Sequence, residues 1–340
     1  MKMKKTMSFI FFSMTIILLP FIFVLTKNPS YEQIMKRFSL GKDISKNSLS
    51  SKSNIYFIID YFSKLLLKSQ PFPEGVETVD FCEHINAVQL EVPKWEKEGL
   101  YEVSAQTREG MMYPAFLVYN WYAEDAPTII FNHGAFEYPF DKTFLRIFNK
   151  DSLKTLKVNL IIIRTPFHQH KGELKNGIKT LSKFLSTMAV STKLTEEVLK
   201  NLRTRGVKFV EVAGISLGGV ISNRHRIIYN SADVYVPIIA GTAHEKLFIR
   251  NKDINQKEID RNKIISQNLN FSAEWNKINT NNVFPICARY DDYCRLNEQG
   301  SSYGNCKIEI WNLGHLTTAV SYRALKPVLL RHLDKNEKTN

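Results

Sequence analysis

The chain has 340 residues, of which 44% are hydrophobic and 12% aromatic, and it carries a formal net charge of +13. This length and apolar content exclude a disordered chain and predict one large core or two small ones. The lysines are scattered and form no basic run interleaved with aromatics, so no nucleic-acid partner is expected. Attraction to an anionic membrane surface, or a bias in composition, explains the charge.

The four cysteines are too few for a disulfide scaffold and include no Cys-x-x-Cys pair, so no metal site is predicted from them. Two readings remain open for the pair Cys294 and Cys306. They form a disulfide if the domain lies outside the cytosol, or they stay free thiols, which we favour.

The amino-terminal residues 1–27 read as a targeting segment. Lys2, Lys4 and Lys5 precede an uncharged apolar run from Met7 to Thr26. The order of charge and apolar run is typical of a secretory signal, and about 20 residues suffice to span a bilayer. We expect an uncleaved signal anchor that links the chain to the membrane, with a cleaved signal peptide as the alternative. Either would place the rest of the chain outside the cytosol.

Residues 28–95 are expected to form a tether and an accessory helical region before a main domain over 96–335. Residues 28–54 are polar and rich in serine, as in a linker. Tyr56–Leu67 has apolar residues at helical spacing, which predicts a helix packed outside the main domain or lying on the membrane surface.

The main domain alternates predicted strands and helices. Arg108-Glu109-Gly110 separates the first two strands, which predicts an antiparallel hairpin. Near-continuous apolar strands joined by helices predict a mostly parallel sheet covered on both faces, an α/β fold. The expected strands are Leu100–Ala105, Met112–Val118, Pro127–Asn132, Val158–Arg164, Val207–Gly214, Val234–Ala240, Val283–Tyr290 and Lys307–Trp311. The expected helices are 173–189, 193–205, the segment that ends near Tyr229, Glu258–Leu269 and Ala319–Leu333. Residues 241–282 are a candidate cap over the site, or a pair of solvated helices.

A nucleophile elbow is predicted where the strand at Val210 ends in Gly214-Ile215-Ser216-Leu217-Gly218-Gly219. The strand–turn–helix context requires small residues two positions either side of the serine, and Gly214 and Gly218 meet that requirement. The turn would hold the Ser216 hydroxyl clear of the sheet, above the start of the next helix.

The two remaining members of a catalytic triad follow the last two predicted strands. Asp291 and Asp292 come directly after one strand, and His315 comes after the other, preceded by Gly314. The order Ser216, Asp291, His315 matches one known triad arrangement. Asp292 remains open as an alternative acid.

An oxyanion hole needs two backbone donors. The amide of Leu217 supplies one at the start of the elbow helix. Ala135 supplies the second, because His133-Gly134-Ala135 directly follows a buried strand and Gly134 permits a close backbone approach.

With these motifs the chain resembles the α/β-hydrolases, from Phe131-Asn132-His133-Gly134 and the elbow to Ala288-Arg289-Tyr290-Asp291 and Gly314-His315. The resemblance covers residues 100–333. It implies that Ser216 attacks an acyl carbonyl, that His315 moves the proton and that Asp291 holds the imidazole. Ala288 stands where many relatives carry glycine, which affects the shape of the acid loop.

The expected function is hydrolysis of carboxylic esters, lipid esters among them, without a cofactor or metal. Phe136 and His168 are candidate substrate contacts near the pocket mouth. A peptidase or amidase of the same fold is the alternative, and a non-catalytic binding protein on this fold is the alternative from another class.

Overall fold

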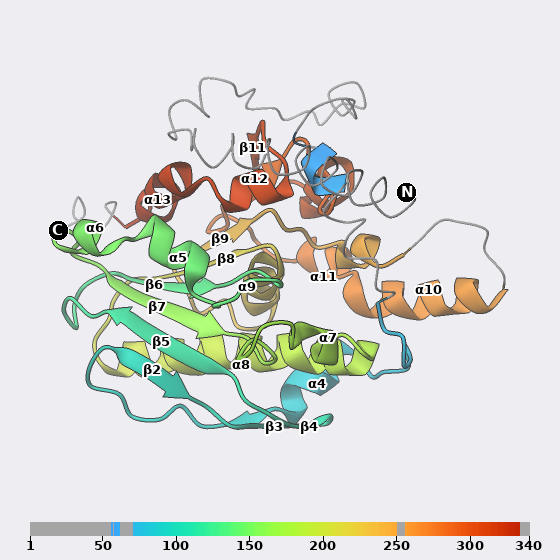
Figure 1. Cartoon of the computed structure of the whole chain (residues 1–340), viewed down its shortest axis with the longest axis horizontal. Helices are drawn as coiled ribbons and strands as arrows, with labels where there is room; N and C mark the ends of the chain where they lie inside the picture. The colour runs from blue at the N-terminus through green and yellow to red at the C-terminus, as the bar shows by residue number, and fades with distance from the viewer. Residues whose placement is uncertain (1–55, 57, 62–70, 250–255, 334–340) are drawn as a thin grey trace, which may run out of the picture.

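The computed structural model describes residues 56, 58–61, 71–249 and 256–333 (Figure 1). The expected signal anchor at the amino terminus and the tether over 28–54 lie outside these residues. Across the part of the chain that is described, no helix combines the length and apolar character needed to cross a bilayer. Among the described residues, the expectation of a transmembrane segment is therefore not met.

The main sheet has eight strands in the order β11-β10-β9-β8-β6-β7-β5-β2. The six strands from β11 to β7 are parallel, whereas β5 runs antiparallel to both β7 and β2. The expected mostly parallel sheet is therefore confirmed. The strands are β2 (Gly99–Glu102), β5 (Ala115–Asn120), β6 (Thr128–Asn132), β7 (Asn159–Arg164), β8 (Val210–Ile215), β9 (Val234–Ile238), β10 (Ile286–Ala288) and β11 (Glu309–Trp311).

The predicted antiparallel hairpin is present, but each of its arms is divided between two sheets. A small sheet pairs β1 (Gln89–Leu90), β3 (Ala105–Thr107) and β4 (Gly110–Met112), while β2 and β5 belong to the main sheet. The division falls at Val103 and Pro114, where the Val103 amide donates to the Pro114 carbonyl at 3.0 Å. Pro114 has no N–H and cannot donate a second backbone hydrogen bond to the facing strand, so the two strands separate there.

Helices cover both faces of the main sheet (Figure 1). On one face, α5 and α13 pack on the strands, with Phe144 against Phe131 at a ring-centroid distance of 4.9 Å. On the other face, α8 and α9 pack on the same strands. Every residue of β6, β7 and β8 is buried, as expected for strands covered on both sides. The helices are α4 (Phe81–Ala87), α5 (Lys142–Ile147), α6 (Lys150–Leu153), α7 (Leu174–Gly177), α8 (Leu181–Thr204), α9 (Leu217–Ile228), η2 (His244–Leu247), α10 (Gln256–Leu269), α11 (Ser272–Trp275), η3 (Leu296–Gly300), η4 (Ser301–Tyr303), α12 (His315–Ala319) and α13 (Tyr322–Leu330).

The two helices expected over 173–205 are largely one. Helix α8 continues through Val190-Ser191-Thr192, where the sequence predicted a break. The Ser191 and Thr192 hydroxyls donate to the carbonyls of Thr187 and Met188, at 3.2 and 2.9 Å. The two hydroxyls thus have hydrogen-bond partners within the helix, so these polar residues do not end it.

Residues 241–282, the candidate cap, contain helices where the structure describes them. The described part of residues 241–282 contains η2, α10 and α11, and a role as a cap stays a prediction. The boundaries proposed for the domains likewise stay predictions. All four cysteines are free thiols, so Cys294 and Cys306 form no disulfide here.

Candidate active site

The nucleophile candidate sits on a strained turn between β8 and α9. Ser216 has φ 55° and ψ −116°, a conformation that a non-glycine residue adopts only where the surroundings enforce it. A Cβ on Gly218 would lie 1.9 Å from the Asn132 carbonyl oxygen, and one on Gly214 would lie 2.2 Å from that of Gly218. The tight packing of the turn therefore requires both glycines, as the sequence predicted for an elbow.

His315 lies on the loop after β11, at the first turn of α12, and faces this serine. Its Nε2 is 2.9 Å from Ser216 Oγ, and its Nδ1 is 2.7 Å from Asp291 Oδ2. The proton on Nδ1 donates to the carboxylate, which leaves Nε2 as the acceptor for the serine hydroxyl. The structure thus brings together all three residues that the sequence predicted as a triad.

Asp291, and not Asp292, reaches the histidine. The second oxygen of Asp291, Oδ1, accepts the backbone amides of Tyr293 and Cys294 at 2.8 and 2.7 Å. These bonds fix the carboxylate in a buried loop after β10. Asp292 Oδ1 instead accepts Arg295, 2.9 Å from Nη2 and 3.1 Å from Nε, and is committed to that ion pair.

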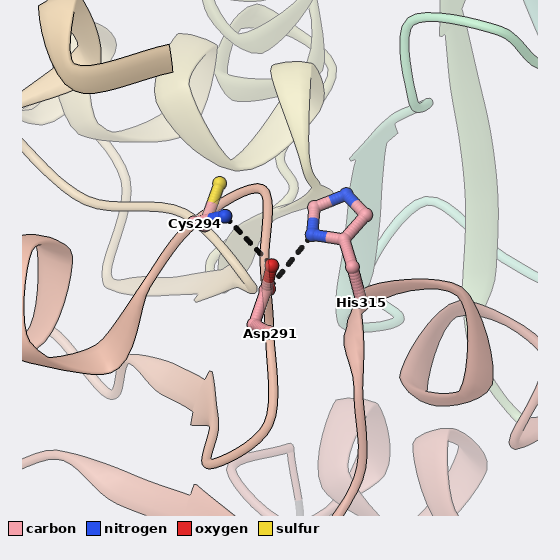
Figure 2. A group of neighbouring side chains, drawn as sticks. All are labelled: Asp291, Cys294 and His315. Atoms are coloured by element: carbon pink, nitrogen blue, oxygen red, sulfur yellow. Dashed lines mark hydrogen bonds and ion pairs between the residues drawn. The ribbon is translucent and has the colours of Figure 1, made fainter. Parts of the chain in front are cut away.

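Figure 2 shows a buried cluster of Asp291, Cys294 and His315. One potential ligand atom from each residue lies within 4.8 Å of the others, so the trio could hold a metal ion. The Asp291 oxygens and His315 Nδ1 are, however, already hydrogen-bonded to protein groups. A cation would have to displace the proton between Asp291 and His315, and the arrangement fits a triad better than a metal centre.

The two backbone amides predicted as oxyanion donors belong to Leu217, directly after the serine, and to Ala135, on a neighbouring loop. Leu217 is the first residue of α9, and an amide at that position has no partner within its helix. Ala135 follows β6 on a loop that lies against the elbow, since a Cβ built on Gly134 would be 3.8 Å from Ser216 Cβ. That Cβ would meet its nearest atom at 3.7 Å, so contacts within the protein do not by themselves require glycine at 134.

Two buried histidines stand behind this loop. The Thr165 amide donates to His133 Nε2 at 3.1 Å, so His133 carries its proton on Nδ1 and donates to the Gly134 carbonyl at 2.8 Å. Burial, with His168 close by, holds the pKa of His133 well below its usual range. His168 Nε2 is 2.6 Å from the Ala135 carbonyl, and its ring centroid is 4.5 Å from that of His133.

This placement of His168 differs from the expected substrate contact. The side chain is buried, its Nδ1 lies 3.0 Å from the Pro166 carbonyl, and burial lowers its pKa. His168 therefore contacts the backbone of the loop that carries Ala135 and is positioned to stabilise that loop. Phe136 projects outward and is 66% exposed, so it is free to meet an apolar group; its role as a substrate contact stays a prediction.

Sequence reasoning missed two carboxyl groups at the site, the partly buried Glu137 and the fully buried Asp60. Glu137 accepts the amides of Gly134 and Thr143, and burial raises its pKa to about 7. Asp60 comes from the amino-terminal helical segment and accepts the amide of His315. Neither residue lies in a recognisable sequence motif. The one sequence signal for Asp60 is that a charged residue interrupts an otherwise apolar helical pattern.

The arrangement of strands and loops decides the fold. The elbow follows β8, and Ala135, the second predicted oxyanion donor, follows β6, the third strand of the main sheet in chain order. The acid and the histidine follow β10 and β11, in the order that this architecture requires. The chain has the α/β-hydrolase fold.

Comparison with known proteins finds similar solved structures but no matching sequence. No protein-family model matches the chain, and no curated protein matches it either. Among solved structures, acylaminoacyl peptidase from Pyrococcus horikoshii is similar, with a TM-score of 0.46, 12% identity, and coverage of 72% of this chain and 42% of that one. An esterase from Pyrococcus furiosus has a TM-score of 0.43 and 15% identity, and the match covers 71% of this chain and 97% of that one. Acetyl xylan esterase 1 from Thermoanaerobacterium sp. has a TM-score of 0.46 and 12% identity, and the match covers 77% of this chain and 98% of that one.

The chain spans less than half of the length of the peptidase that it resembles. At these identities and TM-scores the neighbours say nothing about this chain's reaction or substrate. The assignment of the α/β-hydrolase fold depends on the strand order, the elbow and the loop positions given above.

Proposed function

We propose that the protein is a serine hydrolase that cleaves carboxylic esters through an acyl-enzyme intermediate. One observation carries the proposal: the hydrogen-bond chain from Ser216 Oγ to His315 Nε2, at 2.9 Å, and from His315 Nδ1 to Asp291, at 2.7 Å. A serine hydroxyl is a weak nucleophile at its ordinary pKa, and a histidine held in this orientation by a carboxylate is the base that activates it.

In the first half of the reaction Ser216 Oγ attacks the ester carbonyl carbon while His315 Nε2 takes the hydroxyl proton. Asp291 stabilises the imidazolium that forms, and its two amide bonds keep it from rotating away. The negative charge that develops on the carbonyl oxygen is met by the amides of Leu217 and Ala135. His315 then protonates the leaving alkoxide, the ester bond breaks, and the alcohol departs from the acyl-enzyme.

In the second half a water molecule attacks the acyl-enzyme. His315 takes one proton from the water and returns it to Ser216 Oγ as the acid departs. One ester and one water thus give one carboxylic acid and one alcohol, and the triad ends as it began. The contact between His168 Nε2 and the Ala135 carbonyl oxygen supports this step indirectly, because it fixes the loop that carries one of the two proposed oxyanion donors.

Exposed aromatic side chains beside the oxyanion loop favour an apolar acyl group. Phe136 is 66% exposed and Tyr138 is 44% exposed, within three residues of Ala135. Aromatic side chains of this size bury much apolar area when a hydrocarbon chain covers them. We therefore expect esters with longer apolar acyl groups to be better substrates than acetate esters.

The test is covalent labelling of the purified protein with a fluorophosphonate probe, next to Ser216→Ala and Asp291→Asn. We expect labelling of the parent protein, none of Ser216→Ala, and a large decrease for Asp291→Asn. A series of 4-nitrophenyl esters of increasing acyl length, beside the matching 4-nitroanilides, then separates an esterase from an amidase. A folded parent that neither labels nor cleaves any of these esters would refute the proposed function.

A further inference from the structure

A buried carboxylate far away in the sequence touches the loop of the candidate base. Asp60 belongs to the helical residues 58–61 and is fully buried. Its Oδ2 accepts the backbone amide of His315 at 2.5 Å, and its Oδ1 accepts that of Leu316 at 3.1 Å. In Figure 1 this segment, in blue, lies beside α12.

The same carboxylate also reaches the loop of the acid. The Asp292 amide donates to Asp60 Oδ2 at 3.4 Å, directly after the residue that holds the histidine. The first amides of a helix such as α12 have no partners within the helix, and a carboxylate is a strong acceptor for them. Asp60 therefore joins the loops that carry Asp291 and His315 through backbone bonds to each of them.

The packing around these bonds is close. A Cβ on Gly314 would lie 2.8 Å from Asp60 Oδ2 and 2.8 Å from the Tyr56 carbonyl oxygen. The Tyr56 ring stacks on Tyr290, with centroids 6.2 Å apart, on the strand-to-loop junction that leads to Asp291. The amino-terminal segment thus contacts both loops at two points. Residues 56 and 58–61 therefore pack against the main domain, where the sequence predicted a helix outside it or on the membrane surface.

The charge of Asp60 depends on pH in a physiological range. Its pKa is raised to about 7. Burial raises it most and the charge of Asp291 raises it too, while the charge of His315 and the amide bonds of His315 and Leu316 lower it. On the acid loop, Asp292 also approaches Asp60, but its side chain is paired with Arg295. The bonds to the amides are strongest when the carboxylate is ionised.

We propose that Asp60 is a positioning residue that holds His315 and the acid loop in register through three backbone amides. The proposal rests on the proposed function of the triad. Asp60 does not touch the reacting atoms; it fixes the backbone from which His315 extends. A displacement of about 1 Å at such a position costs roughly 10²-fold in rate.

The test compares Asp60→Ala and Asp60→Asn with the parent in ester hydrolysis, using Asp80→Asn as a matched control. Asp80 also accepts an amide in the first turn of a helix, α4, which lies at the opposite side of the molecule from α12 in Figure 1. We expect Asp60→Ala to lower kcat by about 10- to 10²-fold with KM changed less than about threefold. Asp60→Asn keeps one acceptor oxygen and nearly the same shape, so it should recover part of the loss, and Asp80→Asn should match the parent.

The pH profile separates positioning from a general loss of stability. In the parent, kcat/KM should rise on the acid side as Asp60 ionises, because the pKa of this buried carboxyl is raised to about 7. Asp60→Asn cannot ionise, so the slope of its acid limb should be smaller than that of the parent. If folded Asp60 variants keep both the parent's kcat and its slope, the positioning role is overturned.

A measurement that needs no activity distinguishes this failure from a failure of the proposed function. The low-field proton NMR signal of the His315 Nδ1–H bonded to Asp291 should be present in the parent and in Ser216→Ala. We expect it to weaken in Asp60→Ala. An unreactive parent would refute the proposed function, and persistence of this signal in Asp60→Ala would overturn the positioning role on its own.

Discussion

The elbow gives the most direct test of how tightly the fold constrains the chemistry. In Gly218→Ala the new Cβ would start 1.9 Å from the Asn132 oxygen and 2.4 Å from its carbon, where ordinary contacts are at 3.4–4 Å. The end of β6 and the start of α9 must therefore separate by about 1.5 Å. Those are the elements that carry Ala135 and Leu217. Overpacking of this kind costs roughly 1–3 kcal/mol in the free energy of unfolding.

The same movement separates the two oxyanion donors and shifts the nucleophile between them. Because about 1 Å of misplacement costs about 10²-fold in rate, we expect kcat to fall by at least that factor. The loss of stability leaves a domain with an ordinary margin of about 5–15 kcal/mol folded. Circular dichroism and urea unfolding would check the fold, and ester hydrolysis and fluorophosphonate labelling would check the site.

Gly134→Ala is the matched control, because it adds the same methyl group to the facing loop. Its Cβ would meet nothing nearer than 3.7 Å, so we expect stability to change by less than about 0.5 kcal/mol and kcat by less than about threefold. Equal losses in the two variants, or a Gly218→Ala protein with the parent's kcat, would refute the steric reasoning.

Two further predictions concern buried acids. Burial raises the pKa of Glu211 well above its usual value, and both of its carboxylate oxygens lack a hydrogen-bond partner among the described residues. From about pH 4.5 upward the unfolded chain releases a proton that the native state keeps, so stability falls as pH rises. Glu211→Gln should remove that slope in urea unfolding at several pH values; an unchanged slope would contradict it. Asp291→Asn should lower kcat by roughly 10⁴-fold, while Asp292→Asn should stay within about tenfold of the parent; reversed effects would identify Asp292 as the acid.

Much of the fold and of the site follows from short-range patterns. The apolar runs of β6, β7 and β8 predict buried parallel strands, and the residues directly after strands predict where polar side chains gather. Ser216, Asp291 and His315 meet because parallel strands end at one edge of the sheet. The choice between Asp291 and Asp292 needed the structure, because which side chain turns inward depends on the amides of Tyr293 and Cys294.

The features that sequence reasoning missed depend on contacts between distant residues. The periodicity of the segment at Tyr56 predicts a helix but gives no partner for its face, so an acid within that apolar pattern did not reveal what Asp60 contacts. Glu211 alternates with Val210 and Val212 as a solvent-facing residue of a strand would, and only the helices above the sheet bury it. Helix α8 was divided in the prediction because the bonds that keep Ser191 and Thr192 in the helix are local to the folded conformation.

The bond between Asp60 and His315 also sets an order of events during synthesis. The two residues are 255 positions apart. At typical elongation rates of 5–20 residues per second, Asp60 precedes its partner by about 10–50 s. During that interval the serine and its elbow can form while the base, the acid loop and the carboxylate that joins them are not yet assembled. A nascent chain would therefore have most strands of the sheet before it had His315, and under the proposed mechanism activity would appear only after β11 and α12 had been made.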